Sequence, residues 1–201
     1  MGKCVIFCAG GFETLAQPIG GEDYVIAADG GLRHTQALGI VPQAVLGDFD
    51  SLGYVPEGAE VFPTEKDDTD AMLAIRRGLA LGYREFVIYG SLDGERLEHT
   101  VANFQALRYL AGHGARGTLV GIRQFSTLIK DGTLTFEGCR GYLSLFCMGP
   151  DAVGVTLTGL KYNMENGKLS GSFPLGCSNQ FTEETATVTV QNGCLLAIWD
   201  R

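Results

Sequence analysis

The sequence predicts two folded parts in series. Residues 1–122 are expected to form an α/β domain with a mainly parallel, Rossmann-like sheet, and residues 123–201 an all-β antiparallel sandwich or barrel. In the first part, short apolar runs alternate with helical segments, which is typical of a parallel sheet covered on both faces. In the second part helical periodicity disappears, and short β-type runs separated by turn residues follow one another. With 201 residues, 45% of them hydrophobic, the chain can bury a core in each part.

The expected strands of the first part are apolar runs, most of which end at a glycine or at Asp-Gly. They cover residues 5–8, 24–28, 44–46, 86–89 and 118–122. A short helix is expected to end at Leu38, and a second to run over 69–81, because Gly39 and Gly82 follow as stop signals. A third helix is predicted from an apolar stripe, whose members are Leu97, Val101, Phe104, Leu107 and Ala111.

The second part contains six runs with β character. They cover residues 125–129, 133–136, 142–146, 153–157, 185–190 and 195–199. Turn residues separate them, and the Asn-Gly pairs at 166–167 and 192–193 are hairpin signals.

Charge and cysteine content exclude several classes of protein. The net charge of −8 and the pI near 4.8 argue against a nucleic-acid partner, which requires clustered Lys and Arg. No apolar run is long enough to span a membrane, and the start of the chain is too short for a signal peptide. The six cysteines form no C-x-x-C pair, so we expect reduced, mostly buried thiols in a cytoplasmic protein.

Two acidic clusters stand out, one at residues 47–51 and one at 65–70. Crowded carboxylates repel one another unless a cation or protons offset their charge. Because Mg²⁺ prefers oxygen ligands, the clusters predict a magnesium site, and a magnesium site among acids points to a polyphosphate substrate. There is no G-x-x-x-x-G-K-[ST], so the chain is not a Walker-type NTPase.

The predicted elements place these acids at ligand-binding positions. Asp29 and Asp48 follow expected strands, and ligands of open parallel sheets bind beyond the carboxyl ends of strands. Asp67 and Asp70 share one face at a helix start, where a phosphate is also favoured. Lys66 lies beside them and is expected to contact a phosphate oxygen. The alternative is structural, because Asp and Thr cap helices and glycines mark turns.

One pair of glycines after a predicted strand is a further candidate for phosphate binding. Gly10-Gly11 follows the first run, where backbone amides can approach a phosphate, although a plain turn explains this pair equally well.

In order along the chain, these pieces resemble thiamin pyrophosphokinases of the bacterial type. The matching segments are residues 28–31, 47–51, 66–70, 90–103, 144–146, 159–162 and 176–181. G-D-x-D-S, the later D-x-T-D and S-N together form a specific combination that spans nearly the whole chain. The chain departs from the family pattern G-G-R-x-D-H at two positions, where it has Glu95 and Glu98 around the retained Arg96 and His99.

The resemblance implies a homodimer whose active sites form between the α/β domain of one subunit and the sandwich of the other. It implies transfer of a diphosphoryl group from ATP to thiamin, giving thiamin diphosphate and AMP, with Mg²⁺ as cofactor. The implied Mg²⁺ ligands and catalytic acids are Asp48, Asp50 and Asp70, joined in catalysis by Arg96. The implied nucleotide-binding residues are Gly10, Gly11, Asp29, Gly30, Gly31, Lys66, Asp67 and His99. Ser178 and Asn179 are implied hydrogen-bond partners of the thiamin pyrimidine, and Phe181 is a candidate for stacking on the thiamin cation, with core packing as its alternative.

Two other hypotheses remain open from the residues alone. The acids are also compatible with a two-metal phosphohydrolase acting on nucleotides. The departure at Glu95 and Glu98 keeps a non-catalytic thiamin- or nucleotide-binding protein in consideration.

Overall fold

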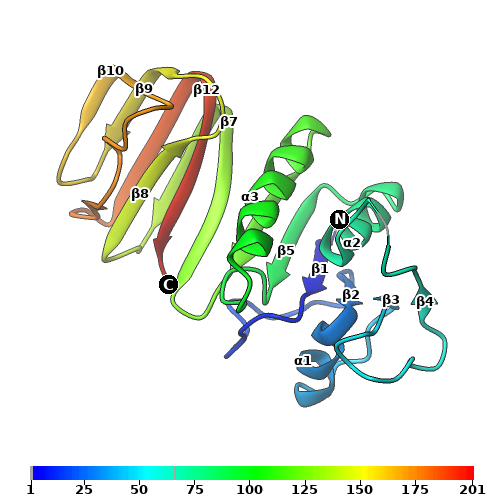
Figure 1. Ribbon diagram of the computed structural model, residues 1–201. Coiled ribbons are helices and arrows are strands. Elements are labelled where there is room, and N and C mark those ends of the chain that lie inside the picture. The colour runs from blue at the N-terminus through cyan, green and yellow to red at the C-terminus, as the bar shows by residue number, and fades with distance from the viewer. Residues whose placement is uncertain (1, 66) are drawn as a thin grey trace. The chain divides into compact units, whose positions relative to one another are not determined.

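The computed structural model describes residues 2–65 and 67–201. The chain divides into two compact units, residues 1–122 and 123–201 (Figure 1). Among the described residues, no helix is both long enough and apolar enough to cross a membrane. The expected phosphate contact of Lys66 lies outside the described residues.

The sheet of the first unit has the order β6-β5-β1-β2-β3-β4, and each recorded pair is parallel. The strands are β1 (Cys4–Phe7), β2 (Tyr24–Ala28), β3 (Ala44–Gly47), β4 (Glu60–Val61), β5 (Glu85–Tyr89) and β6 (Arg116–Val120). The chain runs outward from β1 to β4 and then returns to place β5 on the other side of β1. Such a reversal of strand order creates a crevice at the carboxyl ends of the strands. Strand β4 escaped sequence prediction because it has only two residues, both exposed.

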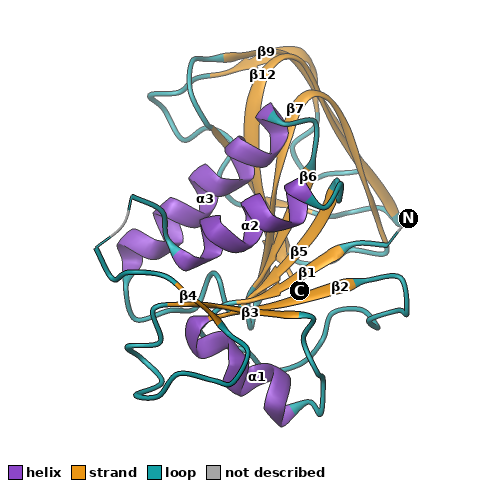
Figure 2. Ribbon diagram, turned by 90° about the vertical axis from the view of Figure 1, so that its right-hand side faces the viewer, coloured by secondary structure: helices purple, strands orange, loops and turns teal. Residues whose placement is uncertain are grey.

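The helical segments of this unit are η1 (Asp29–Gly31), α1 (Leu32–Ala37), α2 (Asp70–Ala80) and α3 (Leu97–Gly112). Figure 2 shows α1 on one side of the sheet and α2 with α3 on the other. The apolar stripe predicted for α3 is wrong at its start, since Leu97 and Val101 are 74% and 51% exposed. The buried face belongs to the last part of the helix and includes Leu107 and Leu110.

Strand β1 is the centre of this unit and is buried along its whole length. Cys4 opens the strand and Cys8 follows its end, and burial raises the pKa of both thiols to about 12. The expectation of buried thiols therefore holds for these two residues, whereas Cys139, Cys147 and Cys194 are only partly buried and Cys177 is exposed.

The second unit is antiparallel in each recorded pair. Its strands are β7 (Gln124–Glu137), β8 (Tyr142–Cys147), β9 (Ala152–Thr158), β10 (Met164–Leu169), β11 (Asn179–Gln180) and β12 (Thr185–Asp200). Most side chains of its hydrophobic core are leucine, valine and alanine, among them Leu143, Val155 and Val188.

Strand β12 replaces two predicted strands and a predicted hairpin. It pairs with β7 along nearly its whole length, while its first part pairs with β9 and its last part with β8. The Asn192-Gly193 pair lies at a register shift between Val190 and Cys194, not at a chain reversal. A bulge of this kind bends a strand, and β12 changes its second partner from β9 to β8 beyond it. The Asn166-Gly167 pair likewise lies at an irregularity inside β10, so neither pair is the hairpin turn predicted from the sequence.

Candidate active site

Three carboxylates come together at the carboxyl ends of β2 and β3. Asp29, Asp48 and Asp50 each offer an oxygen atom, and these atoms lie within 4.8 Å of one another. Asp29 is buried, Asp48 is half-buried and Asp50 is exposed, so the group opens from the protein interior to solvent. The spacing of two between Asp48 and Asp50 therefore brings both side chains to one site, as the sequence indicates.

Unusual backbone angles shape this group. Asp29 and Phe49 have φ angles of 47° and 61°, in the left-handed region that non-glycine residues seldom adopt. The Phe49 side chain is only 2% exposed and anchors the loop between the two acids. Gly47 has φ 150°, and a Cβ there would lie 3.1 Å from Asp29, so glycine allows β3 to end against η1. Strain of this kind is common at functional sites.

Hydrogen bonds hold the three carboxylates together, and two of these bonds involve Ser51 and Arg33, which the sequence does not predict to be site residues. The Ser51 hydroxyl donates to Asp29 Oδ2 at 2.6 Å, and Arg33 Nη2 donates to the Ser51 carbonyl at 2.6 Å. Asp50 N donates to Asp48 Oδ1 at 3.3 Å. Sequence reasoning missed Ser51 and Arg33 as site residues, although Ser51 belongs to the G-D-x-D-S segment and was the available signal.

The donor set fits a hard divalent cation. All three candidate ligands are carboxylates, which Mg²⁺ and Ca²⁺ prefer. Asp29 Oδ1 is buried and has no hydrogen-bond partner among the described residues, a condition that a bound cation would relieve. Without a cation, three carboxylates this close would repel one another.

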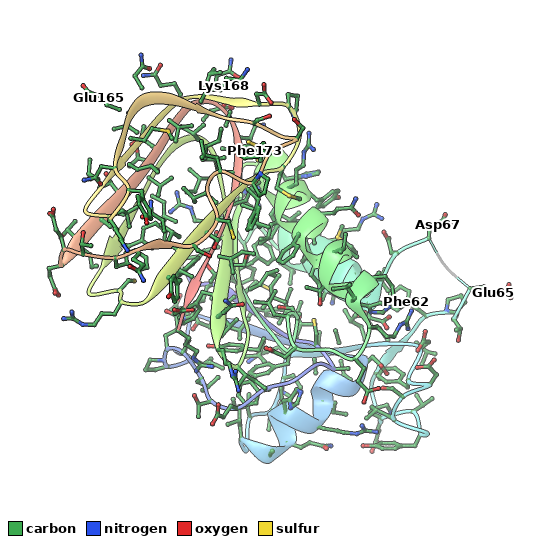
Figure 3. All side chains as sticks on the ribbon, turned by 60° about the vertical axis from the view of Figure 1, so that its left-hand side comes forward. Phe62, Glu65, Asp67, Glu165, Lys168 and Phe173 are labelled. Carbon is green, nitrogen blue, oxygen red and sulfur yellow. The ribbon has the colours of Figure 1, made fainter. Side chains whose placement is uncertain are left out.

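The second acidic segment contributes differently from expectation. The predicted ligand Asp70 is the first residue of α2 and is not a member of the group of three, where Asp29 takes its place. Its charge is close enough to Cys8 to add to the rise in the pKa of that thiol. Thr69 caps α2, accepting a hydrogen bond from Met72 N at 3.2 Å. Asp67 is exposed and lies with Glu65 at the outer edge of the unit in Figure 3.

The two glycine pairs serve close packing. The amides of Gly10 and Gly11 donate to the carbonyls of Gly90 and Asp93 at 3.0 and 2.9 Å, so neither amide is available to a phosphate. This corrects the expectation that these amides meet a phosphate. A Cβ on Gly31 would lie 1.9 Å from the Phe7 carbonyl oxygen, because η1 crosses directly over the end of β1.

Gly30 is enclosed in the same way. A Cβ there would lie 2.9 Å from the Cβ of Ala9 and 3.0 Å from the Ser51 hydroxyl. Its place beside Asp29 makes it part of the scaffold of the acid group.

Arg96 and His99 lie at the start of α3. Arg96 is the N-cap residue, and its carbonyl accepts a hydrogen bond from His99 N at 3.1 Å. Arg96 Nε lies 2.8 Å from Glu98 Oε1, and both side chains are about two-thirds exposed, at 67% and 68%. This contact lowers the pKa of Glu98. Glu98 therefore pairs with Arg96, and an exposed guanidinium remains open to a phosphate.

In the second unit, Ser178 lies in the turn before β11, and Asn179 is the first residue of that strand. Ser178 has φ 59°, and its amide donates to the Ser144 hydroxyl at 3.0 Å. The Asn179 side chain is buried and fully engaged: Nδ2 donates to Tyr162 O at 2.8 Å, and Oδ1 accepts from Tyr162 N and Gln180 N, each at 2.9 Å. Asn179 therefore fixes the backbone of Tyr162, whose side chain is 61% exposed.

Phe181 packs inward. Its ring centroid lies 5.4 Å from that of Phe136, and the side chain rests against the hydrophobic core of the unit. Core packing, the alternative recognised from the sequence, thus accounts for this residue better than stacking on a ligand.

A hollow of about 250 Å³ lies near the Ser178 turn. It is lined by Leu145–Cys147 of β8 and by residues 169–174 and Gly176. The Leu145 amide donates to the Gly176 carbonyl at 2.9 Å, which ties this side of the hollow to the turn that carries Ser178.

Comparison with known families assigns both units. The sequence model of the thiamin pyrophosphokinase catalytic domain matches residues 15–117, and that of the thiamin pyrophosphokinase vitamin B1 binding domain matches residues 133–195. The chain belongs to the thiamin pyrophosphokinase family. The catalytic-domain match contains the carboxylate group, and the vitamin B1 domain match contains Ser178 and Asn179.

Relatives within this family match over the full length. Thiamine pyrophosphokinase of Bacillus subtilis is 26% identical over 210 residues, covering 98% of each chain. The crystal structure of thiamine pyrophosphokinase from Bacillus subtilis superposes with a TM-score of 0.85 at 25% identity, covering 98% of this chain and 99% of the other. A thiamin pyrophosphokinase family protein from Enterococcus faecalis gives 0.82 at 25% identity, with 99% of each chain covered. The chain is thus an enzyme of this family, with its mixed sheet and few helices.

Proposed function

We propose that the chain transfers a diphosphoryl group from ATP to the hydroxyethyl oxygen of thiamin, giving thiamin diphosphate and AMP. The observation that carries the proposal is the group Asp29, Asp48 and Asp50 inside the match to the thiamin pyrophosphokinase catalytic domain. Thiamin diphosphorylation follows from family membership. An assay of AMP release tests whether ATP is the donor and AMP the product.

The same carboxylates are the proposed ligands of Mg²⁺. Asp48 and Asp50 supply oxygens from the loop after β3, and Asp29 supplies one from the start of η1. A bound Mg²⁺ would offset phosphate charge and orient the polyphosphate for in-line transfer. Asp70, at the N-terminus of α2, adds negative charge near β1 and remains a candidate for a second position around the polyphosphate.

The remaining residues are proposed to bind and orient the substrates. Arg96, at the start of α3, would donate charge-assisted hydrogen bonds to a phosphate. In the reaction, a bond forms between the thiamin hydroxyl oxygen and the β-phosphorus, and the bond from that phosphorus to the oxygen of AMP breaks. The hydroxyl proton passes to a nearby carboxylate or to solvent. Because thiamin is a cation, a carboxylate-rich pocket favours its approach.

In the vitamin B1 domain, the exposed Ser178 turn is the proposed partner of the thiamin pyrimidine. Asn179 supports that turn and the Tyr162 backbone from within.

We further propose that the chain works as a homodimer in the cytoplasm. The family resemblance supports a site shared between the α/β unit of one subunit and the sandwich of its partner. The free cysteines found among the described residues support a reducing compartment.

The decisive experiment is a coupled assay of AMP release with ATP and Mg²⁺, with and without thiamin. The proposal expects AMP only with thiamin, and loss of at least about 100-fold in Asp48→Asn and Asp29→Asn, because each removes a charge from the cation site. Glu57→Gln removes an exposed carboxylate in the same unit and serves as the control. Thiamin-independent release of AMP or phosphate would favour the phosphohydrolase, and thiamin binding without turnover would favour the binding protein.

The shared site has its own test. Asp48→Asn and Ser178→Ala, each expected to be impaired, are mixed and allowed to exchange subunits. Recovery of activity would support a site built from two subunits, and sedimentation equilibrium would give the mass. No recovery from a mixture that demonstrably exchanges would contradict the shared site while leaving the reaction intact.

A further inference from the structure

Ser51 is the nearest polar neighbour recorded for the buried carboxylate Asp29, at 2.6 Å between Oγ and Oδ2. We propose that Ser51 is a positioning residue that orients Asp29 toward the cation, a role that rests on the proposed function. It acts through Asp29 and need not touch substrate or metal.

Asp29 is buried, and its two carboxylate oxygens have different surroundings. The residue is 8% exposed, and its backbone is held at φ 47°. Its two oxygens differ: Oδ2 accepts the Ser51 hydroxyl, whereas Oδ1 is buried without a hydrogen-bond partner among the described residues. Buried carboxylate oxygens are rarely left unsatisfied, which marks Oδ1 as the atom that receives a ligand. An oxygen of the same residue lies within 4.8 Å of oxygens from Asp48 and Asp50.

Ser51 is itself fixed from two directions. Arg33 Nη2 holds its carbonyl at 2.6 Å, which anchors the end of the acidic loop to α1. Its hydroxyl fits against Gly30, where an added Cβ would come within 3.0 Å. The hydroxyl therefore has a defined place between Gly30 and Asp29, and glycine at position 30 keeps that place open.

The consequence for the cation site is orientational. With Oδ2 tied to Ser51, rotation of the Asp29 carboxylate is restricted, so both of its oxygens keep a fixed position relative to Asp48 and Asp50. Hydrogen bonds to metal-ligating carboxylates orient the ligand, and their loss typically weakens metal affinity by roughly 10- to 100-fold. Ser51 therefore contributes to cation affinity more than to the chemical step.

Replacing Ser51 tests this role with little effect on packing, because the residue is exposed while its hydroxyl donates to the buried Asp29. Ser51→Ala removes the hydroxyl without opening a cavity in the core. Mn²⁺ alone, titrated into the full-length protein and followed by the electron paramagnetic resonance signal of the free ion, measures affinity without turnover. We expect roughly 10- to 100-fold weaker Mn²⁺ binding in Ser51→Ala, and binding within about threefold of the parent in Ser51→Thr, which retains the hydroxyl.

Ser126→Ala is the matched control. Ser126 is fully buried in the second unit and donates to the Ala197 carbonyl at 3.0 Å, so its loss tests the general effect of removing a serine hydrogen bond. In the assay, Ser51→Ala is expected to raise the Mg²⁺ concentration for half-maximal rate while kcat at saturating Mg²⁺ falls less than threefold.

Two outcomes would overturn the role of Ser51. One is Mn²⁺ affinity in Ser51→Ala within twofold of the parent, and the other is equal weakening in Ser51→Ala and Ser51→Thr. If either occurs while Asp48→Asn has lost Mn²⁺ binding, only the Ser51 proposal fails. If Asp48→Asn also binds Mn²⁺ like the parent, the cation assignment in the proposed function fails as well.

Discussion

Asn179 holds Tyr162 by both ends of its amide, donating to the Tyr162 carbonyl at 2.8 Å and accepting from the Tyr162 amide at 2.9 Å. The two residues are 17 positions apart, and the pair joins the segment after β9 to the start of β11. Asn179, which the family resemblance implies as a thiamin partner, is 6% exposed, and these hydrogen bonds fix the Tyr162 backbone.

Asn179→Asp should destabilise the protein. Aspartate keeps the shape and the acceptor but removes the donor, which leaves the Tyr162 carbonyl beside a carboxylate in a buried place. We expect a loss of about 1–3 kcal/mol in the free energy of unfolding, measured by urea denaturation, together with a higher KM for thiamin. Asn163→Asp is the control, because the hydrogen bond recorded for the Asn163 side chain among the described residues is one that it accepts, from Leu160 N at 3.2 Å. A variant as stable as the parent would contradict the fastening role.

Arg96→Ala should raise the KM for ATP, by about tenfold or more, through loss of charge-assisted hydrogen bonds to phosphate. Arg96→Lys should recover only part of that loss, since lysine lacks the planar pair of donors. Glu98→Gln is the companion variant, because it keeps the side-chain length beside Arg96 and removes the charge. Its melting temperature should match that of the parent, as exposed ion pairs contribute little to stability. An unchanged KM for ATP in Arg96→Ala would exclude Arg96 from the phosphate site.

Gly31→Ala should lower the free energy of unfolding by at least about 2 kcal/mol. The backbone at this position has φ −59°, which alanine adopts freely, so the effect isolates the contact of the new methyl group with the Phe7 carbonyl. Gly21→Ala is the control, since a Cβ there has no atom within 4 Å. It should remain within about 0.5 kcal/mol of the parent in the same denaturation experiment. Equal stability of the two variants would show that η1 does not pack against β1 as described.

Acid should weaken the second unit between pH 4 and pH 2 through Asp151. Lys168, whose Nζ lies 2.6 Å away, and the Gly171 amide hold the pKa of this carboxyl at about 2, below its ordinary value of 3.8. The folded state therefore binds this proton less readily than the unfolded chain, and the stabilisation is present above pH 4 and lost as the pH falls toward 2.

Asp151→Asn should accordingly melt at a lower temperature than the parent at pH 5, and the difference should shrink below pH 4 and vanish only below the folded-state pKa of about 2. Glu165, which with Lys168 is labelled at the periphery in Figure 3, provides the control variant Glu165→Gln. A difference in melting temperature that does not change with pH would show that the charge of Asp151 is not the cause.

The acid group was predictable because its information is local. The spacing of Asp48 and Asp50 and their position after a strand required no knowledge of distant contacts, and the same holds for the strands of the first unit other than the two-residue β4. The place of Asp29 in the group of three is not local information, because which loops meet depends on the order β2-β3 in the sheet, and the sequence prediction assigns this residue to the nucleotide.

The errors share a physical origin in contacts between residues far apart in sequence. Gly10 and Gly11 have amides engaged by carbonyls about 80 residues later, at Gly90 and Asp93. Asn192-Gly193 has the composition of a hairpin, yet both flanking segments continue to pair with β7, so the same residues form a bulge. Local sequence specifies that a backbone can bend there, whereas the partner strand decides whether the chain reverses.

The two thiols at the ends of β1 can report the rate at which the α/β unit unfolds locally. With pKa values near 12 and little exposure, Cys4 and Cys8 can react with an alkylating reagent only when the central strand is released to solvent. Exposed Cys177 reports the reagent's access to the unopened protein. The labelling rate of Cys4 and Cys8 relative to that of Cys177 therefore measures opening of the α/β unit, and no cysteine needs to be introduced.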